Sequence, residues 1–389
     1  MSSSQPLTRR VVLQRAGAAG LALSLPSVLA ACGGVEGTNE SGSQTTPAAE
    51  VDHPKTAIGT LAFTNWPLYI DKSVLEDFER EFDATVRYTE EINDNEEYFA
   101  KVRQELESGR PIGRDLVVLT DWMARRWIEA GYVEPIDKDN VPNAKNLAPA
   151  LQGPPFDPER RFTLPWQSGM TAIGYDVKRC GRELTSVNDL FDPKFKGRVS
   201  MLSDWRDSAG LVTLGMGKGT AEATKDDLLA AVDKIDEANR NGQIRRFTGN
   251  DYTGDLTKGN LWVCVAYSGD VIQLQADNPN LRFVIPEEGG ILWSDNMMIP
   301  KGAEQPYGAE AMMNYVYDPE VAAKIAAEVN YVSPVQGAQE VLARTDEETA
   351  ANELIFPTAQ TQEKLNPYPG FSDAEEREIA SRFVEVTGG

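Results

Sequence analysis

The sequence contains almost no histidine, and it lacks the glycine-rich loop that binds nucleotide phosphates. Its one histidine, His53, lies in a stretch expected to be a tether, which leaves none for the folded part. This excludes Ser-His-Asp and Cys-His catalytic arrangements and a histidine-based metal cluster there. Residues 215–220 (GMGKGT) miss the spacing of a phosphate loop and have glycine where its hydroxyl residue belongs. We therefore expect no metal and no cofactor, and a plain loop at residues 215–220.

Cysteine is also scarce, with three residues in a chain of 389. Cys264 lies in an apolar run and is expected to be a buried thiol, whereas Cys180 lies in a polar stretch that predicts a turn. A disulfide between them would suit a compartment outside the cytoplasm. Whether they pair is left open at this point, because the sequence gives no geometry for the two residues.

Positive charge is in deficit, since 38 Lys and Arg face 60 Asp and Glu and give a formal net charge of −22. Residues 1–31 contain three arginines and no acid, so removal of this segment takes the net charge from −22 to −25. Such a surface repels nucleic acid and favours cations. Solubility or salt tolerance explains most of the negative charge, so the charge by itself counts only weakly for a cationic ligand.

The first residues have the features of an export signal. Residues 8–13 (TRRVVL) have the twin-arginine form, and the apolar stretch after them is shorter than the roughly 20 residues of a membrane-spanning helix. Residues 29–33 (LAACG) resemble the lipobox of bacterial lipoproteins. We expect a signal peptide at residues 1–31, a lipid on Cys32 and a flexible tether over residues 32–54. The protein would then be extracytoplasmic and anchored to the outer face of the cytoplasmic membrane, in the periplasm if an outer membrane is present. An incidental cysteine in a plain tail is the alternative.

Apolar periodicity predicts alternating strands and helices at the start of the body. Strands are expected at residues 57–63, 85–88 and 115–119, with helices from residue 72 (capped by Asp71) and over residues 95–108 between them. This order makes a largely parallel sheet with right-handed crossovers. Ligands of such sheets bind at the carboxyl ends of the strands. The loops at these ends carry Trp66, Tyr69, Thr120 and Trp122.

A second run of elements begins near residue 171. Strands are expected at residues 200–202 and 261–267, an amphipathic helix at 225–238, a crossing back to the first lobe at 296–300, and helices at 307–317, 319–330 and 373–386.

Two aromatic residues are each followed within three positions by a carboxylate, where strands are expected to end. They are Tyr267 with Asp270 and Trp293 with Asp295. A ring face attracts an organic cation and a carboxylate pairs with ammonium hydrogens, so such pairs suit the binding of amines. Each residue alone has an ordinary explanation, because tryptophan packs cores and aspartate caps helices. The repeated pattern at one sheet edge is what predicts a site.

With these motifs the chain resembles the spermidine/putrescine-binding proteins of bacterial polyamine ABC transporters, from about residue 61 to residue 371. The segments that carry the resemblance are residues 65–69 (NWPLY), 115–118 (DLVV), 171–174 (TAIG), 204–207 (DWRD), 267–270 (YSGD), 288–295 (EGGILWSD) and 331–334 (YVSP). The resemblance implies an α/β, two-lobed periplasmic-binding-protein fold of type II-like form, each lobe a mostly parallel sheet flanked by helices, with the ligand cleft between the lobes. We expect lobe 1 at residues 55–172 and about 294–340, and lobe 2 at residues 173–293 and about 341–389.

The resemblance also implies function. It implies a non-enzymatic protein that captures a polyamine and delivers it to the permease of an ABC transporter. We expect this protein to be a monomer. Three alternatives stay open: another amine or small organic solute in the same fold, a hydrolase that uses two of the aspartates, and an adaptor lipoprotein without a ligand.

Ligand-binding roles follow from the resemblance position by position. It assigns aromatic walls to Trp66, Tyr69 and Trp293, amine-pairing acids to Asp204, Asp207 and Asp295, and further contacts to Thr120, Tyr267, Asp270 and Tyr331. Pro67 and Leu68 stand where relatives carry polar or acidic residues. Asp121 and Trp122 replace a Thr-Tyr type of pair, so Asp121 is expected to supply the charge that Leu68 lacks. These departures leave the particular polyamine open.

Overall fold

The computed structural model describes residues 51–388. The expected signal peptide, Cys32 and most of the expected tether lie outside the described residues. The last part of the tether prediction needs correction, because His53 is already held by the body. Its Nδ1 lies 2.6 Å from Oε1 of the buried Glu310, and Asn140 donates a hydrogen bond to its carbonyl oxygen at 2.8 Å. Over residues 51–388, no helix combines the length and the apolar character needed to cross a bilayer.

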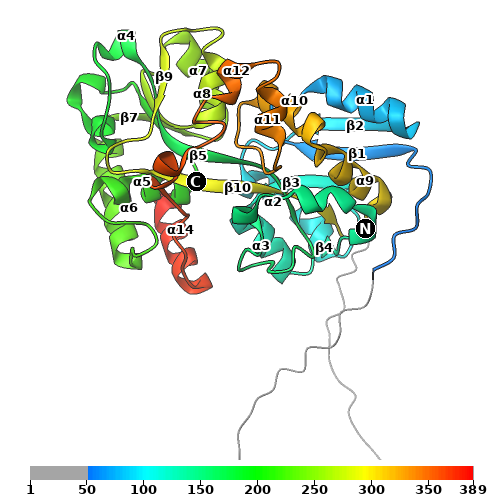
Figure 1. Ribbon diagram of the computed structural model, residues 1–389. Helices are drawn as coiled ribbons and strands as arrows, with labels where there is room; N and C mark the ends of the chain where they lie inside the picture. Colours follow the sequence, from blue (N-terminus) through cyan, green and yellow to red (C-terminus); the bar gives the residue numbers. More distant parts are fainter. Residues whose placement is uncertain (1–50, 389) are drawn as a thin grey trace, which may run out of the picture. The chain divides into compact units, whose positions relative to one another are not determined.

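An eleven-stranded mixed sheet forms the centre of this part of the chain (Figure 1). Its strands are β1 (Thr60–Asn65), β2 (Thr85–Glu90), β3 (Leu116–Thr120), β4 (Val133–Glu134), β5 (Leu164–Asp176), β6 (Val199–Leu202), β7 (Ile244–Thr248), β8 (Val263–Tyr267), β9 (Leu281–Val284), β10 (Gly290–Pro300) and β11 (Leu365–Asn366). The main order is β2-β1-β3-β10-β5-β8-β6-β7, while β4 and β11 pair with β10 and β9 pairs with β5. Two parallel groups, β2-β1-β3 and β8-β6-β7, are joined through the antiparallel strands β10 and β5.

Helices cover the sheet and connect its strands (Figure 1). They are α1 (Lys72–Phe82), α2 (Asn95–Glu107), α3 (Asp121–Glu129), α4 (Val177–Cys180), α5 (Trp205–Gly215), α6 (Lys225–Arg240), α7 (Tyr252–Lys258), α8 (Ser268–Leu274), α9 (Pro306–Val316), α10 (Pro319–Val329), α11 (Ala338–Leu342), α12 (Glu347–Ala350), α13 (Ala359–Gln362) and α14 (Asp373–Thr387). Helix α1 begins where predicted, because the Asp71 side chain accepts a hydrogen bond from the Ser73 amide at 2.8 Å. The segment after Gly215 is a loop, as predicted.

The buried apolar side chains form two clusters. Core 1 packs β1, β3 and helices α1, α2, α3, α9 and α10, with Phe63, Phe78 and Trp127 among its members. Core 2 packs β6, β8 and helices α5, α6 and α14. The residues packed on core 1 are called the first half below, and those packed on core 2 the second half. This is the predicted two-lobed α/β fold, and the exact lobe boundaries stay a prediction.

Both cysteines of the described part are buried free thiols. Cys180 is the last residue of α4, and the expectation of a polar turn there is wrong because its side chain packs into core 2. Cys264 lies in β8, buried as predicted. No disulfide joins the two.

Candidate ligand-binding site

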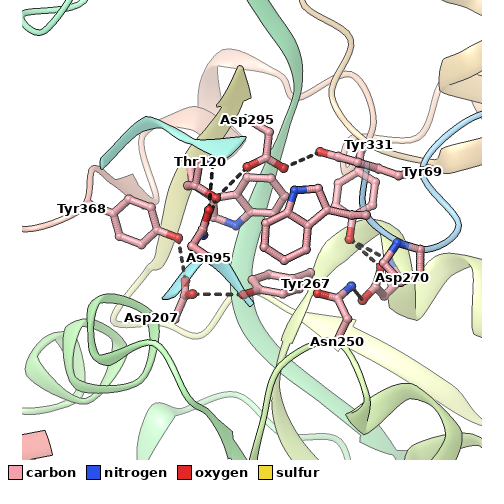
Figure 2. A pocket seen from close by; sticks show the side chains of 13 residues that line it. Tyr69, Asn95, Thr120, Asp207, Asn250, Tyr267, Asp270, Asp295, Tyr331 and Tyr368 are labelled. Atoms are coloured by element: carbon pink, nitrogen blue, oxygen red, sulfur yellow. Dashed lines mark hydrogen bonds between the residues drawn. The ribbon is translucent and has the colours of Figure 1, made fainter. Parts of the chain in front are cut away.

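A pocket lies where the ends of β1, β3 and β8 meet β10, between the two halves (Figure 2). Its lining is rich in aromatic rings and carboxylates, and none of its side chains is basic. It consists of Trp66, Pro67, Tyr69, Asn95, Thr120, Asp207, Asn250, Tyr267, Asp270, Trp293, Asp295, Tyr331 and Tyr368.

The parallel strands deliver their side chains to the pocket in the predicted way. Trp66 follows the last residue of β1, Thr120 ends β3, and Tyr267 ends β8. Asp270 lies in the first turn of α8, directly after β8. Carboxyl ends of neighbouring parallel strands open at the same edge of a sheet, so residues far apart in sequence converge there.

Trp293 and Asp295 reach the pocket differently, because they lie inside β10 and not after a strand end. The strand-end interpretation of this pair is therefore wrong. Alternation along the strand puts both side chains on the same face. The register between β10 and β5 shifts between Ser294 and Asn296, beside Asp295. Such irregularities re-aim side chains near binding sites.

Asp295 is buried and accepts two hydroxyl hydrogen bonds. Thr120 donates to its Oδ1 at 2.7 Å, and Tyr69 donates to its Oδ2 at 3.0 Å. Burial raises the pKa of Asp295 to about 7, and the hydroxyl donors offset only part of that rise. All three residues belong to the first half, so this group forms within that half.

Asp207 is also buried, at the other side of the pocket (Figure 2). Thr171 donates to its Oδ1 at 2.6 Å, Tyr368 donates to the same oxygen at 3.0 Å, and Tyr267 donates to Oδ2 at 3.1 Å. Burial raises the pKa of Asp207 above its usual range, while the hydroxyl groups oppose the rise.

Asp270 forms the third acidic corner (Figure 2). Tyr331 donates to its Oδ1 at 2.7 Å, Tyr252 to its Oδ2 at 2.8 Å, and the Asn250 amide to the same oxygen at 3.2 Å. Burial raises its pKa to about 6, against the hydroxyl donors. Figure 2 shows Tyr267 between Asp207 and Asp270, so a ring separates these two acids.

The aromatic rings are fixed in place by hydrogen bonds and close packing. Trp66 Nε1 donates to the Val118 carbonyl at 3.1 Å, and Trp293 Nε1 donates to Thr171 Oγ1 at 3.0 Å. The Trp293 ring centroid lies 5.3 Å from that of Tyr267, edge to face. Gly169 makes room for this ring, since a Cβ there would lie 2.4 Å from the Trp293 indole. The walls are therefore held in place by the protein's own contacts.

Three predicted residues do not line this pocket. Asp204 caps α5, accepting a hydrogen bond from the Arg206 amide at 2.9 Å, and it lines a small adjoining cavity beyond Trp66 and Tyr267. Asp121 accepts a hydrogen bond from Asn296 at 2.6 Å and does not supply charge beside Leu68. The physical reason is that α3 begins at Asp121, and the helical turn directs its side chain away from that of Thr120.

Trp122 is the third. Its ring faces the Arg206 guanidinium, whose central carbon lies 3.9 Å from the ring centroid. The cation at the Trp122 ring is therefore the protein's own Arg206. The expected role of Trp122 in ligand binding needs correction for this reason. Leu68 is 57% exposed and has a left-handed φ of 55°, so it points away from the pocket that its neighbour Pro67 lines.

Sequence reasoning missed Asn95, Asn250 and Tyr368 as lining residues. Asn95 opens α2, and its Nδ2 donates to Thr120 Oγ1 at 2.9 Å. Asn250 lies two residues after the end of β7. The sequence analysis did not predict that strand, and therefore did not place Asn250 at the edge where the parallel strands end. Tyr368 comes from an irregular segment near the C-terminus, where no local pattern marks it.

The arrangement suits the binding of an organic cation. Buried carboxylates with no basic partner in the lining offer negative charge, and ring faces between them offer apolar contact that also attracts cations. Among the described residues, no cluster of His, Cys, Asp and Glu has the arrangement of a metal site.

Comparison with known proteins gives a consistent result. The family model for bacterial extracellular solute-binding proteins matches residues 73–357. The chain is 28% identical over 306 residues to the spermidine/putrescine-binding periplasmic protein of Salmonella typhimurium, covering 78% of this chain and 85% of that protein. It is 26% identical over 344 residues to a putrescine/cadaverine-binding protein of Pseudomonas aeruginosa, covering 85% and 94%. The structure of the spermidine/putrescine ABC transporter substrate-binding protein PotD from Streptococcus pneumoniae superimposes with a TM-score of 0.70 at 26% identity, covering 85% of this chain and 99% of that one.

Proposed function

Because this chain belongs to the bacterial extracellular solute-binding proteins, the non-enzymatic solute-capturing components of ABC transporters, we propose that its solute is a polyamine. The polyamine would bind in the pocket between the two halves and pass from there to the membrane permease. The proposal rests on the acids and rings of the pocket and on the likeness to spermidine/putrescine-binding proteins.

The observation that carries the proposal is the unbalanced charge of the lining. Asp207, Asp270 and Asp295 are all buried there, and no lysine or arginine lines the pocket with them. Uncompensated carboxylates disfavour an anionic or neutral solute, because each ionised acid would stay buried without a counter-charge. Several acids separated by rings match a solute with several ammonium groups separated by methylenes.

The energetics are adequate for tight binding. A charge-assisted hydrogen bond contributes about 1.5–3 kcal/mol, a desolvated cation–π contact about 2 kcal/mol, and a buried methylene about 0.8 kcal/mol. Two ammonium ends and the chain between them give a gross gain of roughly 10 kcal/mol or more. Association costs of about 4–15 kcal/mol offset much of it. We then expect a dissociation constant in the micromolar range, which corresponds to a binding free energy of about −8 kcal/mol.

Calorimetry tests the proposal directly. The chain from residue 33 onward is titrated with putrescine, cadaverine, spermidine and spermine, and with 1,4-butanediol as an uncharged match for putrescine. We expect at least one polyamine to bind with a micromolar or tighter dissociation constant and the diol to show no binding. Binding of the diol as tight as that of putrescine would refute the proposal. A simple monoamine that binds better than every polyamine would favour the alternative of another amine in the same fold.

We further propose that Cys32, which lies outside the described residues, carries the lipid that anchors the protein. Its support is the lipobox-like segment LAACG at residues 29–33. Cell fractionation of a Cys32→Ala variant tests it, with release from the membrane fraction as the expected result. Retention of the variant in that fraction would contradict the lipid anchor.

A further inference from the structure

One end of the second half carries more positive than negative charge, although the chain as a whole is acidic. Three segments form this end, residues 176–198, 258–262 and 279–282. They contain eight Lys and Arg against four Asp and Glu, an excess of four positive charges in a chain whose net charge is −22. We call these three segments the basic pole.

Hydrogen bonds join the three segments into one continuous region. The Val177 amide donates to the Asn280 carbonyl at 3.0 Å, and Arg198 Nη1 donates to the Asn260 carbonyl at 3.2 Å. The basic pole lies at the amino ends of β6 and β8, because these strands begin directly after its residues. The ligand pocket lies at the carboxyl end of β8, and no residue of the basic pole lines it.

Six cations of the basic pole have no carboxylate partner. Lys194 Nζ donates to the Cys180 carbonyl at 2.6 Å, and the Arg198 guanidinium carbon lies 5.6 Å from the Trp262 ring centroid. Neither contact neutralises a charge. Within residues 51–388 none of the six forms an ion pair, and all are exposed except the half-buried Arg198. The six are Lys178, Lys194, Lys196, Arg198, Lys258 and Arg282.

The acids of the basic pole, in contrast, are already engaged. Three of the four pair with arginines of the same segments at 2.6–3.4 Å, and the fourth accepts a hydrogen bond from a tyrosine hydroxyl. The pairs are Asp176 with Arg179, Asp189 and Asp192 with Arg182, and Glu183 with Tyr175. Of the acids next to the pole, Asp255 pairs with Arg246 at 3.0 Å, whereas Asp277 is exposed. An anionic surface at this end would therefore meet mainly unpaired cations.

The rest of the chain gives this charge a direction. Outside the basic pole the formal net charge is −26, which repels an anionic surface. Salt screens exposed charges beyond about 8 Å at physiological ionic strength. A surface in contact with the basic pole therefore responds mainly to the positive excess of the pole, and the acidic remainder keeps the other sides of the protein away.

We propose that the basic pole binds the anionic headgroups of a phospholipid membrane. Solute-binding proteins of ABC transporters work beside a membrane, so such a surface is close to this protein. The six unpaired cations are spread over three segments, which matches a surface with many charges. Each Lys or Arg near an anionic bilayer strengthens binding by about fivefold. Several together support reversible attachment without a dedicated pocket.

The proposal predicts how the protein lies at the membrane. His53 is held by Glu310 of α9 in the first half, whereas α4 of the basic pole lies at the opposite end of the body (Figure 1). Twenty residues separate His53 from Cys32, and they span at most about 70 Å. A protein held both by a lipid on Cys32 and by the basic pole lies along the membrane.

Vesicle co-flotation tests the proposal with the chain from residue 33 onward, which carries no lipid. Vesicles of phosphatidylcholine alone are compared with vesicles of equal parts phosphatidylcholine and phosphatidylglycerol, at about 0.02 M and about 0.5 M sodium chloride, where the screening lengths differ several-fold. We expect binding to the phosphatidylglycerol vesicles at low salt, loss of this binding at high salt, and no binding to phosphatidylcholine alone.

A triple variant locates the binding surface. Lys178→Gln, Lys196→Gln and Lys258→Gln combined remove three exposed cations of the basic pole. Binding to the phosphatidylglycerol vesicles should weaken by about 100-fold, three steps of about fivefold. The melting temperature should stay unchanged, because none of the three side chains is buried or ion-paired.

The matched control is the combination of Lys72→Gln, Lys145→Gln and Lys301→Gln. These lysines are exposed, lie in the first half and form no ion pair within residues 51–388. The control has the same net charge as the first triple variant, so it should bind the vesicles as the unchanged protein does.

Four results would overturn the proposal. They are no binding of the unchanged protein to phosphatidylglycerol vesicles, equal binding to phosphatidylcholine alone, an equal loss in both triple variants, and binding to soluble polyglutamate without binding to vesicles. The last would assign the basic pole to an acidic protein surface. The test contains no polyamine, so its failure is distinguishable from failure of polyamine binding.

Discussion

Binding of a polyamine should depend steeply on pH between 6 and 8. Burial in the closed pocket raises the pKa of Asp295 to about 7 and that of Asp270 to about 6. Only an ionised carboxylate pairs with an ammonium group, and alkylammonium groups with a pKa of about 10 remain protonated over this range. Lowering the pH through these pKa values therefore protonates the acids and removes the form that binds.

The two pKa values set the size of the effect. The fraction of protein with both acids ionised falls about twentyfold from pH 8 to pH 6, so the affinity should fall by about the same factor, or about 1.8 kcal/mol. At pH 6 binding should release about 1.4 protons from these two acids, against about 0.1 at pH 8. Asp207, whose pKa burial also raises, makes the loss larger.

Calorimetry at each pH in two buffers of different ionisation enthalpy measures both quantities. The Asp295→Asn variant is the control, because it lacks the group that titrates near pH 7 and should show only the smaller change that the titration of Asp270 and Asp207 causes. His53 does not line the pocket and does not contribute through direct contact with solute. Equal affinity at pH 6 and pH 8 without proton release would show that these acids do not hold the cation.

Further predictions concern single residues. Asp295→Asn and Trp293→Ala should each weaken polyamine binding at pH 8 by about tenfold or more, the loss of one charged or ring contact; unchanged affinity in both calorimetric titrations would mean that this pocket is not the site. Folding raises the pKa of Asp295 from 3.8 to about 7, so burial of this carboxyl lowers the stability of the folded protein as the pH rises from about 4 to 7, and the full penalty is present above pH 7. Asp295→Asn should therefore raise Tm at pH 8 in calorimetric melting, and a lowered Tm would contradict the burial argument. Gly249→Ala places a Cβ 2.4 Å from the carbonyl oxygen of Asn93, so it should keep the halves from closing fully and enlarge the radius of gyration of the protein saturated with polyamine. An unchanged radius would show that this contact does not limit closure. Tyr368→Phe removes a hydroxyl donor from Asp207, whose pKa burial already raises. The pKa of Asp207 should then rise further, so the affinity for polyamine should fall more steeply toward pH 6. An unaltered pH profile would show that this hydroxyl does not stabilise the ionised acid.

The sequence was informative wherever local pattern decides structure. Capping by Asp71 and the apolar spacing of α1 predicted that helix. The rule that parallel strands open at one edge predicted that Trp66, Tyr69 and Thr120 lie close together, and all three line the pocket. These residues follow short-range signals, and such signals are readable from one chain.

The parts of the site that the sequence did not predict depend on the exact residue at which a strand or helix ends, or on contacts between residues that are far apart in the sequence. Asp121 and Thr120 are neighbours in sequence, yet the change from strand to helix between them sends their side chains to different partners. Tyr368 reaches Asp207 across 161 positions of sequence. Trp122 has the residue type of a ligand wall, and only the position of Arg206 shows which cation it meets.

The distribution of the acids between the halves has a consequence for how a diamine would act. Asp295 has both of its hydroxyl donors in the first half, while Asp207 lies on α5 of the second half. A diamine held by one acid would present its second ammonium group to the other acid at a high effective concentration, as in a chelate. That gain is largest when the methylene chain matches the span between the carboxylates in the closed protein. The solute would thus act as a crosslink between the halves. Full closure would then favour the diamine whose length matches the distance between the two carboxylates.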